Sequence, residues 1–300
     1  MNAEFSQKPL QIATGSTKPI HIFEKAGSNI DDAVVQAFGE EWLKFNNFSA
    51  HDVKQFGDEY FDIAPPGMLN PQTYVLDVGC GSGRFSKYLS SQVGFIEAID
   101  PSDAIWAAEK LLADTPNVRL SKAAADDIPF ADNTFDLVMS IGVLHHIPDT
   151  AAAMQRCVQK VKPGGHFFVY LYYNLDNRGF IFKSIFKTIS VIRRFVSTRS
   201  AGFKKILCDI IAVLVYMPVI LLGRLFNLIG LKKAAEALPL SYYQDKSFFV
   251  IRNDALDRFG TRLEHRFTKQ EITAMMQGAG LTDIVFSPNK PYWHAIGRRQ

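Results

Sequence analysis

The chain has 300 residues, of which 47% are hydrophobic and 21% are charged, with a formal net charge of +3. These proportions are typical of a folded globular protein and exclude disordered, collagen-like and coiled-coil classes, and the charge is too small to indicate nucleic acid by itself. Three cysteines without CxxC spacing predict neither a disulfide framework nor a zinc site.

The predicted secondary structure alternates between strands and helices along most of the chain. Residues 1–30 are punctuated by Gly, Ser and Pro, so we expect little regular structure there, and no signal peptide. Apolar residues at helical spacing predict an amphipathic helix over residues 31–45. Predicted strands then cover 74–78, 95–99, 118–120, 135–140 and 166–172, with predicted helices over 85–89, 104–113 and 151–161. This alternation predicts an α/β domain with a parallel sheet and helices on both faces.

The pattern breaks at Asn174 and resumes near Thr268. Thr268 and Glu271 have the spacing of a capping box that begins a helix ending at Met276. Strand-like segments follow at 282–286 and 292–296. Residues 174–250 are therefore predicted to be an insertion in one α/β domain.

A glycine-rich loop follows the first of these predicted strands. Gly79, Gly81 and Gly83 carry no Cβ atom, so a ligand can approach the backbone closely and positive φ angles are accessible. The predicted helix after the loop points its N–H groups toward that ligand. Seventeen residues past Gly83, the next strand ends at Asp100, whose carboxylate can accept hydrogen bonds from both hydroxyls of a ribose.

Two classes of cofactor fit this loop. A dinucleotide would need a glycine or alanine at position 84, but Arg84 stands there and the third glycine comes one residue early. Asp77 lies two residues before the first glycine, where it could orient the ammonium group of a bound amino acid. A nicotinamide oxidoreductase is therefore disfavoured.

Four further motifs follow in order, at residues 126–130 (DDIPF), 133–138 (NTFDLV), 140–149 (SIGVLHHIPD) and 161–165 (VKPGG). With the VLDVGCGSGRF run at 75–85, they resemble the class I S-adenosylmethionine-dependent methyltransferases, and among them the methyltransferase type 11-like domains. The resemblance covers residues 75–172 strongly and the last forty residues loosely. It implies a Rossmann-like fold with a mostly parallel seven-stranded sheet, and transfer of a methyl group from S-adenosylmethionine.

The resemblance also implies a role for each matching residue. The methionine end of S-adenosylmethionine would lie against Asp77, Gly79, Gly81 and Gly83. The ribose and adenine would lie against Asp100, Pro101, Ser102, Ala125 and Asp126. Ser140, Ile141 and His146 would close over the sulfonium. Relatives often carry an aspartate two residues before Asp126, but Ala124 stands there in this chain.

His145 and His146 are the candidate catalytic residues. Both come directly after the predicted fourth strand, on the cofactor side of the sheet, where an imidazole could take a proton from a hydroxyl at neutral pH. The alternative is that one packs and the other binds the loop. An Asn/Asp-Pro-Pro-aromatic tetrapeptide, typical of amino-methylating nucleic-acid enzymes, is absent here, and no metal site is predicted.

The predicted insertion differs in composition from the rest of the chain. Between residues 178 and 233 there are 11 Lys or Arg and one acid, Asp209, which gives this segment a charge of 11 − 1 = +10. Residues 210–223 carry no charge; as a helix they would extend over roughly 21 Å, whereas a bilayer core measures about 30 Å. We therefore predict contact with an anionic membrane surface or a lipid substrate, rather than a membrane span. An internal lid, a dimer core and an RNA contact are the alternatives.

Together these features predict a four-part chain: an N-terminal extension and helical cap (1–70), an S-adenosylmethionine-binding core (71–173), a basic and hydrophobic helical insertion (174–250), and a C-terminal completion of the sheet (251–300). The expected function is O-, C- or N-methylation of a small-molecule or lipid-linked acceptor, for which an isoprenoid quinone or polyprenyl-linked sugar would suit the insertion. We expect a cytoplasmic protein, peripheral at the inner face of the membrane. A non-catalytic module of the same fold and an RNA methyltransferase are the alternatives, and the sequence leaves the oligomeric state open.

Overall fold

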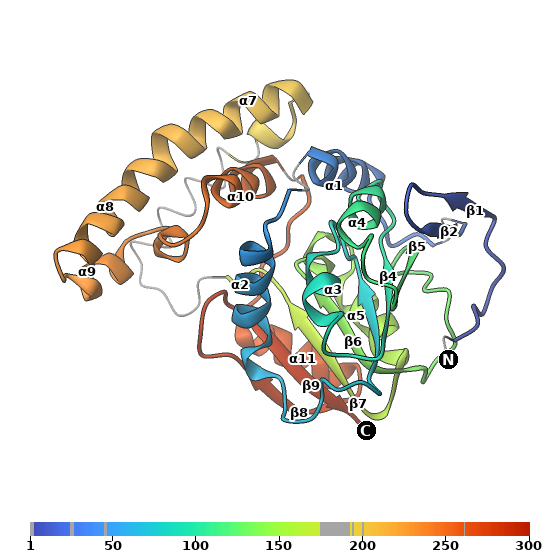
Figure 1. Cartoon of the computed structure of the whole chain (residues 1–300). Helices are drawn as coiled ribbons and strands as arrows, with labels where there is room; N and C mark the ends of the chain where they lie inside the picture. Colours follow the sequence, from blue (N-terminus) through green and yellow to red (C-terminus); the bar gives the residue numbers. More distant parts are fainter. Residues whose placement is uncertain are drawn as a thin grey trace. The chain divides into compact units, whose positions relative to one another are not determined.

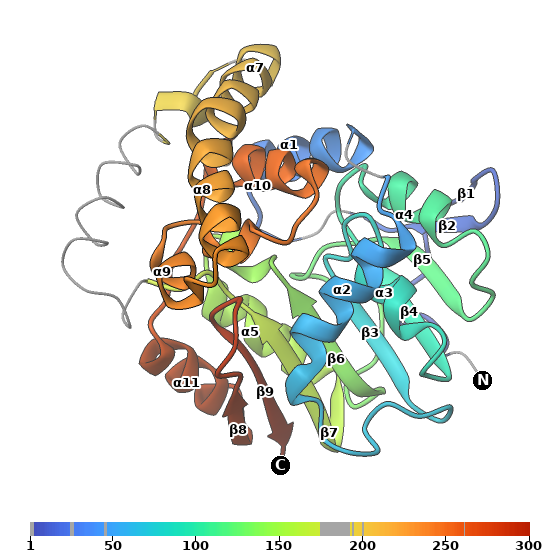
Figure 2. The same cartoon turned by 60° about the vertical axis from the view of Figure 1, so that its left-hand side comes forward.

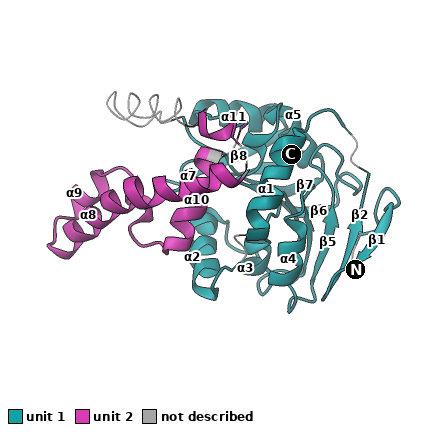
Figure 3. Cartoon of the chain, turned by 90° about the horizontal axis from the view of Figure 1, so that it is seen from above, with its two compact units in different colours: residues 1–176, 263–300 teal, residues 177–262 magenta. Residues whose placement is uncertain are grey.

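The computed structural model describes residues 3–24, 27–44, 47–174, 193, 195–199, 201–260 and 262–300. Phe45 of the first predicted helix lies outside these ranges, as do residues 178–192, Arg194 and Ser200 of the basic segment. The chain divides into two compact units (Figure 3): unit 1 comprises Met1–Asp176 and Leu263–Gln300, and unit 2 comprises Asn177–Arg262. The four-part division of the chain remains a prediction.

Unit 1 contains the α/β sheet that the sequence predicts, with helices on both of its faces (Figure 1). Its strands are β1 (Gln11–Thr14), β2 (Pro19–Ile22), β3 (Tyr74–Val78), β4 (Phe95–Ile99), β5 (Val118–Lys122), β6 (Phe135–Ile141), β7 (Val161–Tyr170), β8 (Leu281–Phe286) and β9 (His294–Arg299). Its helices are α1 (Asp32–Lys44), α2 (Ala50–Tyr60), α3 (Arg84–Leu89), α4 (Ile105–Leu111), α5 (Thr150–Gln159) and α11 (Lys269–Gly278), with short 3₁₀ turns η1 (Phe61–Ile63) and η2 (Leu144–His146).

The order of strands in the sheet is β1-β2-β5-β4-β3-β6-β7-β9-β8. β2 through β7 pair in parallel, whereas β1, β8 and β9 pair antiparallel. The chain crosses from β3 outward to β4 and β5, then returns to β6 on the other side of β3. Ligands of open α/β sheets bind at such a reversal, outside the carboxyl ends of the strands. The mostly parallel α/β fold is confirmed.

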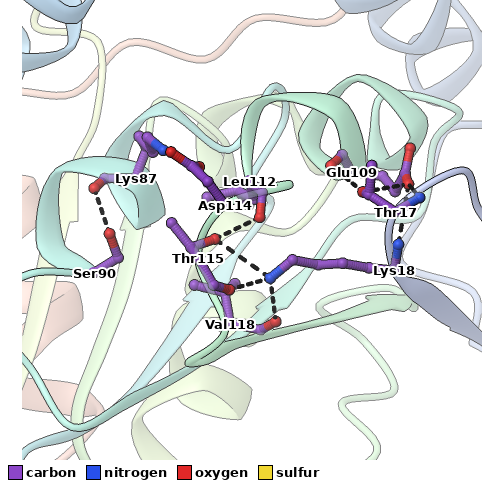
Figure 4. Close-up of polar contacts among 9 residues, drawn as sticks. All are labelled: Thr17, Lys18, Lys87, Ser90, Glu109, Leu112, Asp114, Thr115 and Val118. Atoms are coloured by element: carbon purple, nitrogen blue, oxygen red, sulfur yellow. Dashed lines mark hydrogen bonds and ion pairs between the residues drawn. The ribbon is translucent and has the colours of Figure 1, made fainter.

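The sheet has nine strands in the described residues rather than seven, because the N-terminal segment that we expected to have little regular structure forms the β1–β2 hairpin. Contacts far along the chain hold it (Figure 4): Lys18 Nζ donates to the carbonyls of Thr115 and Val118, and the Glu109 carboxylate accepts from Thr17 Oγ1 at 2.6 Å. These partners lie more than 90 residues away in sequence. The hairpin is therefore held in place by α4, by β5 and by the turn between them.

The predicted capping box at the start of α11 is present. Thr268 Oγ1 accepts a hydrogen bond from the Glu271 backbone N–H, and the Glu271 carboxylate accepts from the Thr268 backbone N–H. Two of the four N–H groups that have no partner at a helix start are satisfied in this way. The cap fixes where the chain resumes the sheet after the insertion.

Unit 2 is helical, with α7 (Ala201–Ile211), the π-helical turn η3 (Ala212–Tyr216), α8 (Met217–Leu228), α9 (Lys232–Ala237), the 3₁₀ turn η4 (Ser241–Tyr243) and α10 (Phe248–Gly260). Helices α7 and α8 run on as one rod beside α10 (Figures 1 and 2). The π-helical turn comes just before Pro218, which cannot donate a backbone hydrogen bond to the preceding turn.

The rod is longer than the sequence predicts. Its 27 residues from Gly202 to Leu228 are long and apolar enough to cross a membrane, judged by length and composition alone. The prediction of a short helix rested on the charge-free run between Asp209 and Arg224. Both charges have partners: Arg252 donates to both Asp209 carboxylate oxygens, at 2.9 and 2.8 Å, and Arg224 donates to the Gln244 and Lys246 carbonyls. Both residues lie inside the rod, Asp209 in α7 and Arg224 in α8, so the helix runs past the two charges that were expected to bound it.

Candidate cofactor and acceptor site

The loop after β3 has the backbone geometry that its glycines predict. Gly79, Gly81 and Gly83 have φ angles of 76°, 54° and 81°, in the left-handed region that favours glycine. A Cβ atom on Gly79 would lie 2.5 Å from the Val143 side chain, and one on Gly81 would lie 3.2 Å from Trp42 Nε1. The loop is therefore packed closely between α1 and the segment after β6, at the reversal point of the sheet.

Asp100 connects this loop to the end of β4. Its Oδ2 accepts a hydrogen bond from the Gly81 backbone N–H at 2.9 Å, and its Oδ1 accepts from the N–H and hydroxyl of Ser102 at 2.9 and 2.6 Å. Burial raises the pKa of Asp100, while the hydrogen bonds from Ser102 and Gly81 oppose that rise. A buried carboxylate thus lies beside the glycine loop.

Asp77 is buried at the end of β3, with 2% of its surface exposed. Among the described residues its carboxylate accepts one hydrogen bond, from Ser86 Oγ at 2.7 Å. Burial raises the pKa of Asp77 to about 7; Ser86 lowers it and the Asp100 charge raises it further. A buried carboxylate with so few partners is suited to a cationic group of a ligand.

The other predicted cofactor residues surround the same reversal point. The Ser140 hydroxyl donates to the Val78 carbonyl at 2.9 Å and so joins β6 to β3. Ile141 and Ala125 are buried, and Pro101 is half-buried. Asp126 is half-buried and its Oδ2 accepts from the Asn29 backbone N–H at 3.1 Å. The sequence did not reveal this contact with the N-terminal segment.

His145 and His146 lie in η2, beyond the end of β6, and both are buried. The His145 ring stacks on Tyr172 with centroids 3.9 Å apart, and neither of its ring nitrogens has a hydrogen-bond partner in the described parts of the chain. The ring of His146 lies 4.8 Å from Phe38, and its Nδ1 is 2.8 Å from the Leu263 carbonyl oxygen. Burial, followed by the charges of His146, Arg266 and His265, holds the pKa of His145 well below its usual value.

Residues distant in sequence complete this aromatic cluster, and they were missing from the predicted site. The His265 backbone N–H donates to the His145 carbonyl at 2.8 Å, the Arg266 guanidinium lies 5.2 Å from the Tyr172 ring centre, and Tyr60 contacts Tyr170. Tyr60 belongs to α2, and the segment at 263–267 follows the insertion. No local pattern marks these positions, because only the return of the chain after residue 262 brings them to β7.

Arg84 has a structural role where a dinucleotide loop would have glycine or alanine. Its guanidinium lies 5.0 Å from the ring centre of Trp42 in α1, 5.5 Å from that of Phe48 in the connection, and 4.9 Å from that of Phe56 in α2. Such cation–π contacts stabilise the packing of a cation against aromatic faces. Arg84 therefore joins the N-terminal helices to the start of α3, next to the glycine loop.

In the described ranges, no group of three His, Cys, Asp or Glu side chains could hold a metal ion. The site thus consists of a glycine loop with two buried carboxylates, a buried pair of histidines and an aromatic cluster, at the reversal point of a mostly parallel sheet. This combination lies where open α/β sheets bind their ligands.

Comparison with known proteins identifies the family of this domain. Residues 76–169 match the family described as "Methyltransferase domain". The chain is 36% identical over 154 residues to 2-methyl-6-phytyl-1,4-hydroquinone methyltransferase of Synechocystis, which covers 49% of this chain and 44% of that protein. It is 30% identical over 152 residues to ubiquinone biosynthesis O-methyltransferase of Pseudomonas fluorescens, covering 47% of this chain and 63% of the relative.

The matched regions span less than two thirds of the length of either relative.

Among solved structures, a putative methyltransferase from Bacillus halodurans aligns with a TM-score of 0.47 at 15% identity, over 79% of this chain and 73% of that chain. The region from residue 76 to 169 belongs to the methyltransferase domain family. The chain therefore carries a class I S-adenosylmethionine-dependent methyltransferase domain, as the motifs predicted.

Proposed function

We propose that this chain transfers a methyl group from S-adenosylmethionine to an oxygen, carbon or nitrogen of a small or lipid-linked acceptor. The observation that carries the proposal is the pair of buried carboxylates, Asp77 and Asp100, on either side of a left-handed glycine loop within a methyltransferase domain. The names of the two relatives, a hydroquinone methyltransferase and a ubiquinone biosynthesis O-methyltransferase, support a quinol-like lipid acceptor.

The residues present fit S-adenosylmethionine. Asp77, buried with one hydrogen bond, would hold the ammonium group, with Gly79, Gly81 and Gly83 beside the methionine end. Asp100 and Pro101 would hold the ribose side, Ala125 and Asp126 the adenine, and Ser140 and Ile141 the sulfonium side. When bound, the cofactor supplies an activated methyl group on a sulfonium. The protein's part is to hold the acceptor atom in line with that methyl group and to exclude water.

The pKa of Asp77 predicts how cofactor binding depends on pH. The ammonium group of S-adenosylhomocysteine pairs with the ionised carboxylate, whose pKa is about 7 without ligand. Below pH 7 a proton must leave when the ligand binds, so we expect the Kd to rise by about tenfold per pH unit as the pH falls. Calorimetry between pH 5.5 and 7 measures this slope, and Asp77→Asn should remove it. A flat profile in the wild type would contradict the assignment.

The same shift makes a prediction for stability in the absence of ligand. The pKa of Asp77 in the folded protein, about 7, lies above its ordinary value of 3.8. Between these two pH values the Asp77 carboxyl is protonated in the folded protein and ionised in the unfolded chain. The contribution of Asp77 to stability therefore falls as the pH rises from about 4 to about 7. Bound ammonium offsets this loss, and the stabilisation by ligand should be larger at pH 7 than at pH 5.5.

His145 is the residue that we propose as general base for a hydroxyl acceptor, with His146 beside it. Its lowered pKa keeps the ring neutral at neutral pH, and its two buried nitrogens lack partners among the described residues. We expect His145→Ala to lower kcat by about 100-fold for a phenolic acceptor while the Kd of S-adenosylhomocysteine changes little. His166→Ala, a half-buried histidine within β7, is the matched control.

Transfer of labelled methyl groups from S-adenosylmethionine to short-chain hydroquinols tests the function itself. Turnover with the wild type, reduced in His145→Ala and retained in His166→Ala, supports the proposal. Because the His145 pKa is lowered, kcat should not fall between pH 8 and 6 through protonation of this ring. Cofactor binding without turnover on hydroxyl, amine or carbon acceptors would instead indicate a non-catalytic module.

We further propose that residues 178–233 bind the cytoplasmic face of a membrane and that the enzyme takes its acceptor from that membrane. The basic composition of this segment supports the proposal. Its residues from 201 to 233 lie in unit 2, where the long rod is apolar. Anionic headgroups attract such basic segments, and apolar side chains partition below the headgroups.

A further inference from the structure

The rod formed by α7, η3 and α8 leaves one apolar face exposed. Of the 18 large hydrophobic residues exposed in the described chain, 12 lie between residues 203 and 231. Ile206, Ile210, Leu214, Leu221, Leu225 and Leu228, here called the apolar stripe, are three, four or seven residues apart and so share one side of the rod. Leu214 is 69% exposed and Leu228 is 83% exposed. Soluble monomers rarely expose a continuous patch of this kind, which marks an interaction surface.

The opposite side of the rod packs against α10, which also carries charged groups. Cys208, Ala212, Tyr216 and Ile220 are buried in one core with residues of α10. Helix α10 carries Asp254, which accepts hydrogen bonds from the Tyr216 and Tyr243 hydroxyls, and Arg258, which contacts the Asp254 carboxylate. A rod that crossed a bilayer would carry these charges into hydrocarbon at high cost. The rod is long enough to span, but its partner helix favours an orientation along the membrane surface.

The charges near the rod favour an anionic surface. The one acid within the rod, Asp209, is paired by Arg252 through two hydrogen bonds, which removes a negative charge that anionic headgroups would repel. Lys204 and Lys205 lie near its start, and the exposed Lys232 and Lys233 follow its end, close to Glu236. Because both ends of the rod carry lysines, two copies packed through the apolar stripe would bring lysines toward lysines in a parallel or an antiparallel pair. Lipid therefore fits this face better than a second copy.

We propose that the apolar stripe inserts into one leaflet of an anionic membrane with the rod parallel to the surface. The proposal deepens the proposed function, since it assigns the membrane contact to particular residues and to an in-plane orientation. It applies to unit 2 alone and does not depend on the cofactor site. Lipid binding and cofactor binding can therefore be measured separately on the full chain.

Flotation of the full chain with vesicles tests the proposal. We expect binding to vesicles that contain phosphatidylglycerol, weaker binding to phosphatidylcholine alone, and release at alkaline pH, which extracts surface-bound proteins but not membrane-spanning ones. Leu214→Glu with Leu221→Glu should lower the partition coefficient by at least about tenfold. Val285→Glu is the matched control, because Val285 is 50% exposed on β8 in unit 1. Lys204→Glu with Lys205→Glu should remove the preference for phosphatidylglycerol.

Calorimetry with S-adenosylhomocysteine accompanies each variant and shows that unit 1 remains folded. Loss of flotation with cofactor binding intact supports the apolar stripe as the lipid surface. The proposal would be overturned if the wild type did not float with the vesicles or resisted alkaline extraction. It would also be overturned if the wild type were a dimer that the Leu214 and Leu221 changes dissociate. Flotation without cofactor binding would refute the proposed function and leave this inference standing.

Discussion

Replacing Asp100 with alanine is expected to weaken binding of S-adenosylhomocysteine by about 1000-fold and to remove methyl transfer at ordinary cofactor concentrations. Asp100 is proposed to accept hydrogen bonds from two ribose hydroxyls, and each such bond to a charged group contributes roughly 1.5–3 kcal/mol. The same carboxylate accepts from the Gly81 N–H and from Ser102, so the change also loosens the glycine loop. Calorimetry on both proteins at one pH measures the loss.

Two further variants separate these effects. Asp100→Asn keeps the shape of the side chain and one acceptor oxygen, so its loss should be smaller than that of Asp100→Ala. Asp103→Asn changes a neighbouring carboxylate that is 58% exposed and paired with Lys122, and cofactor affinity should stay within about twofold of wild type. If Asp100→Ala bound the cofactor as tightly as Asp103→Asn, the ribose assignment would be wrong.

Replacing Arg119 with methionine is expected to lower the free energy of unfolding of unit 1 by about 3–5 kcal/mol. Arg119 donates to both oxygens of the Glu97 carboxylate, at 2.8 and 2.7 Å, and the Glu97 side chain is only 1% exposed. Tyr74 Oη donates to the same carboxylate at 2.5 Å. Removal of the guanidinium leaves a buried carboxylate without its cation, which costs far more than the loss of a surface pair.

Urea unfolding of the full chain, followed by circular dichroism, measures this change. Lys54→Met is the matched control, because the Lys54–Asp58 pair is 73% and 50% exposed, and water screens such a pair so that its loss should change the free energy of unfolding little. The double variant Arg119→Met with Glu97→Leu should recover most of the loss, since it removes both charges and leaves apolar volume. A single Arg119 variant as stable as the Lys54 variant would contradict the buried-pair interpretation.

The sequence by itself determined the features that depend on neighbouring residues. Alternating apolar runs and turn signals predicted β3 to β7 with their helices, because a parallel sheet buried on both faces requires such strands. The glycines at 79, 81 and 83 predicted a left-handed loop, and Thr268 with Glu271 predicted the start of α11. Each of these signals acts over fewer than about ten residues, so the chain around it is enough.

Tertiary structure decided the features that depend on distant partners. Four-residue strands such as β1 and β2 carry too little pattern to be predicted, and Lys18 and Glu109 hold them across more than 90 residues. The charge of Asp209 bounded the helix that the sequence predicted. In the structure Arg252, 43 residues away, pairs with the Asp209 carboxylate. Arg84 was informative as a departure from a dinucleotide loop, but its aromatic partners in α1 and α2 could not be foreseen. A side chain's charge is visible in the sequence, but the partner that sets its energetic effect is fixed only when the chain folds.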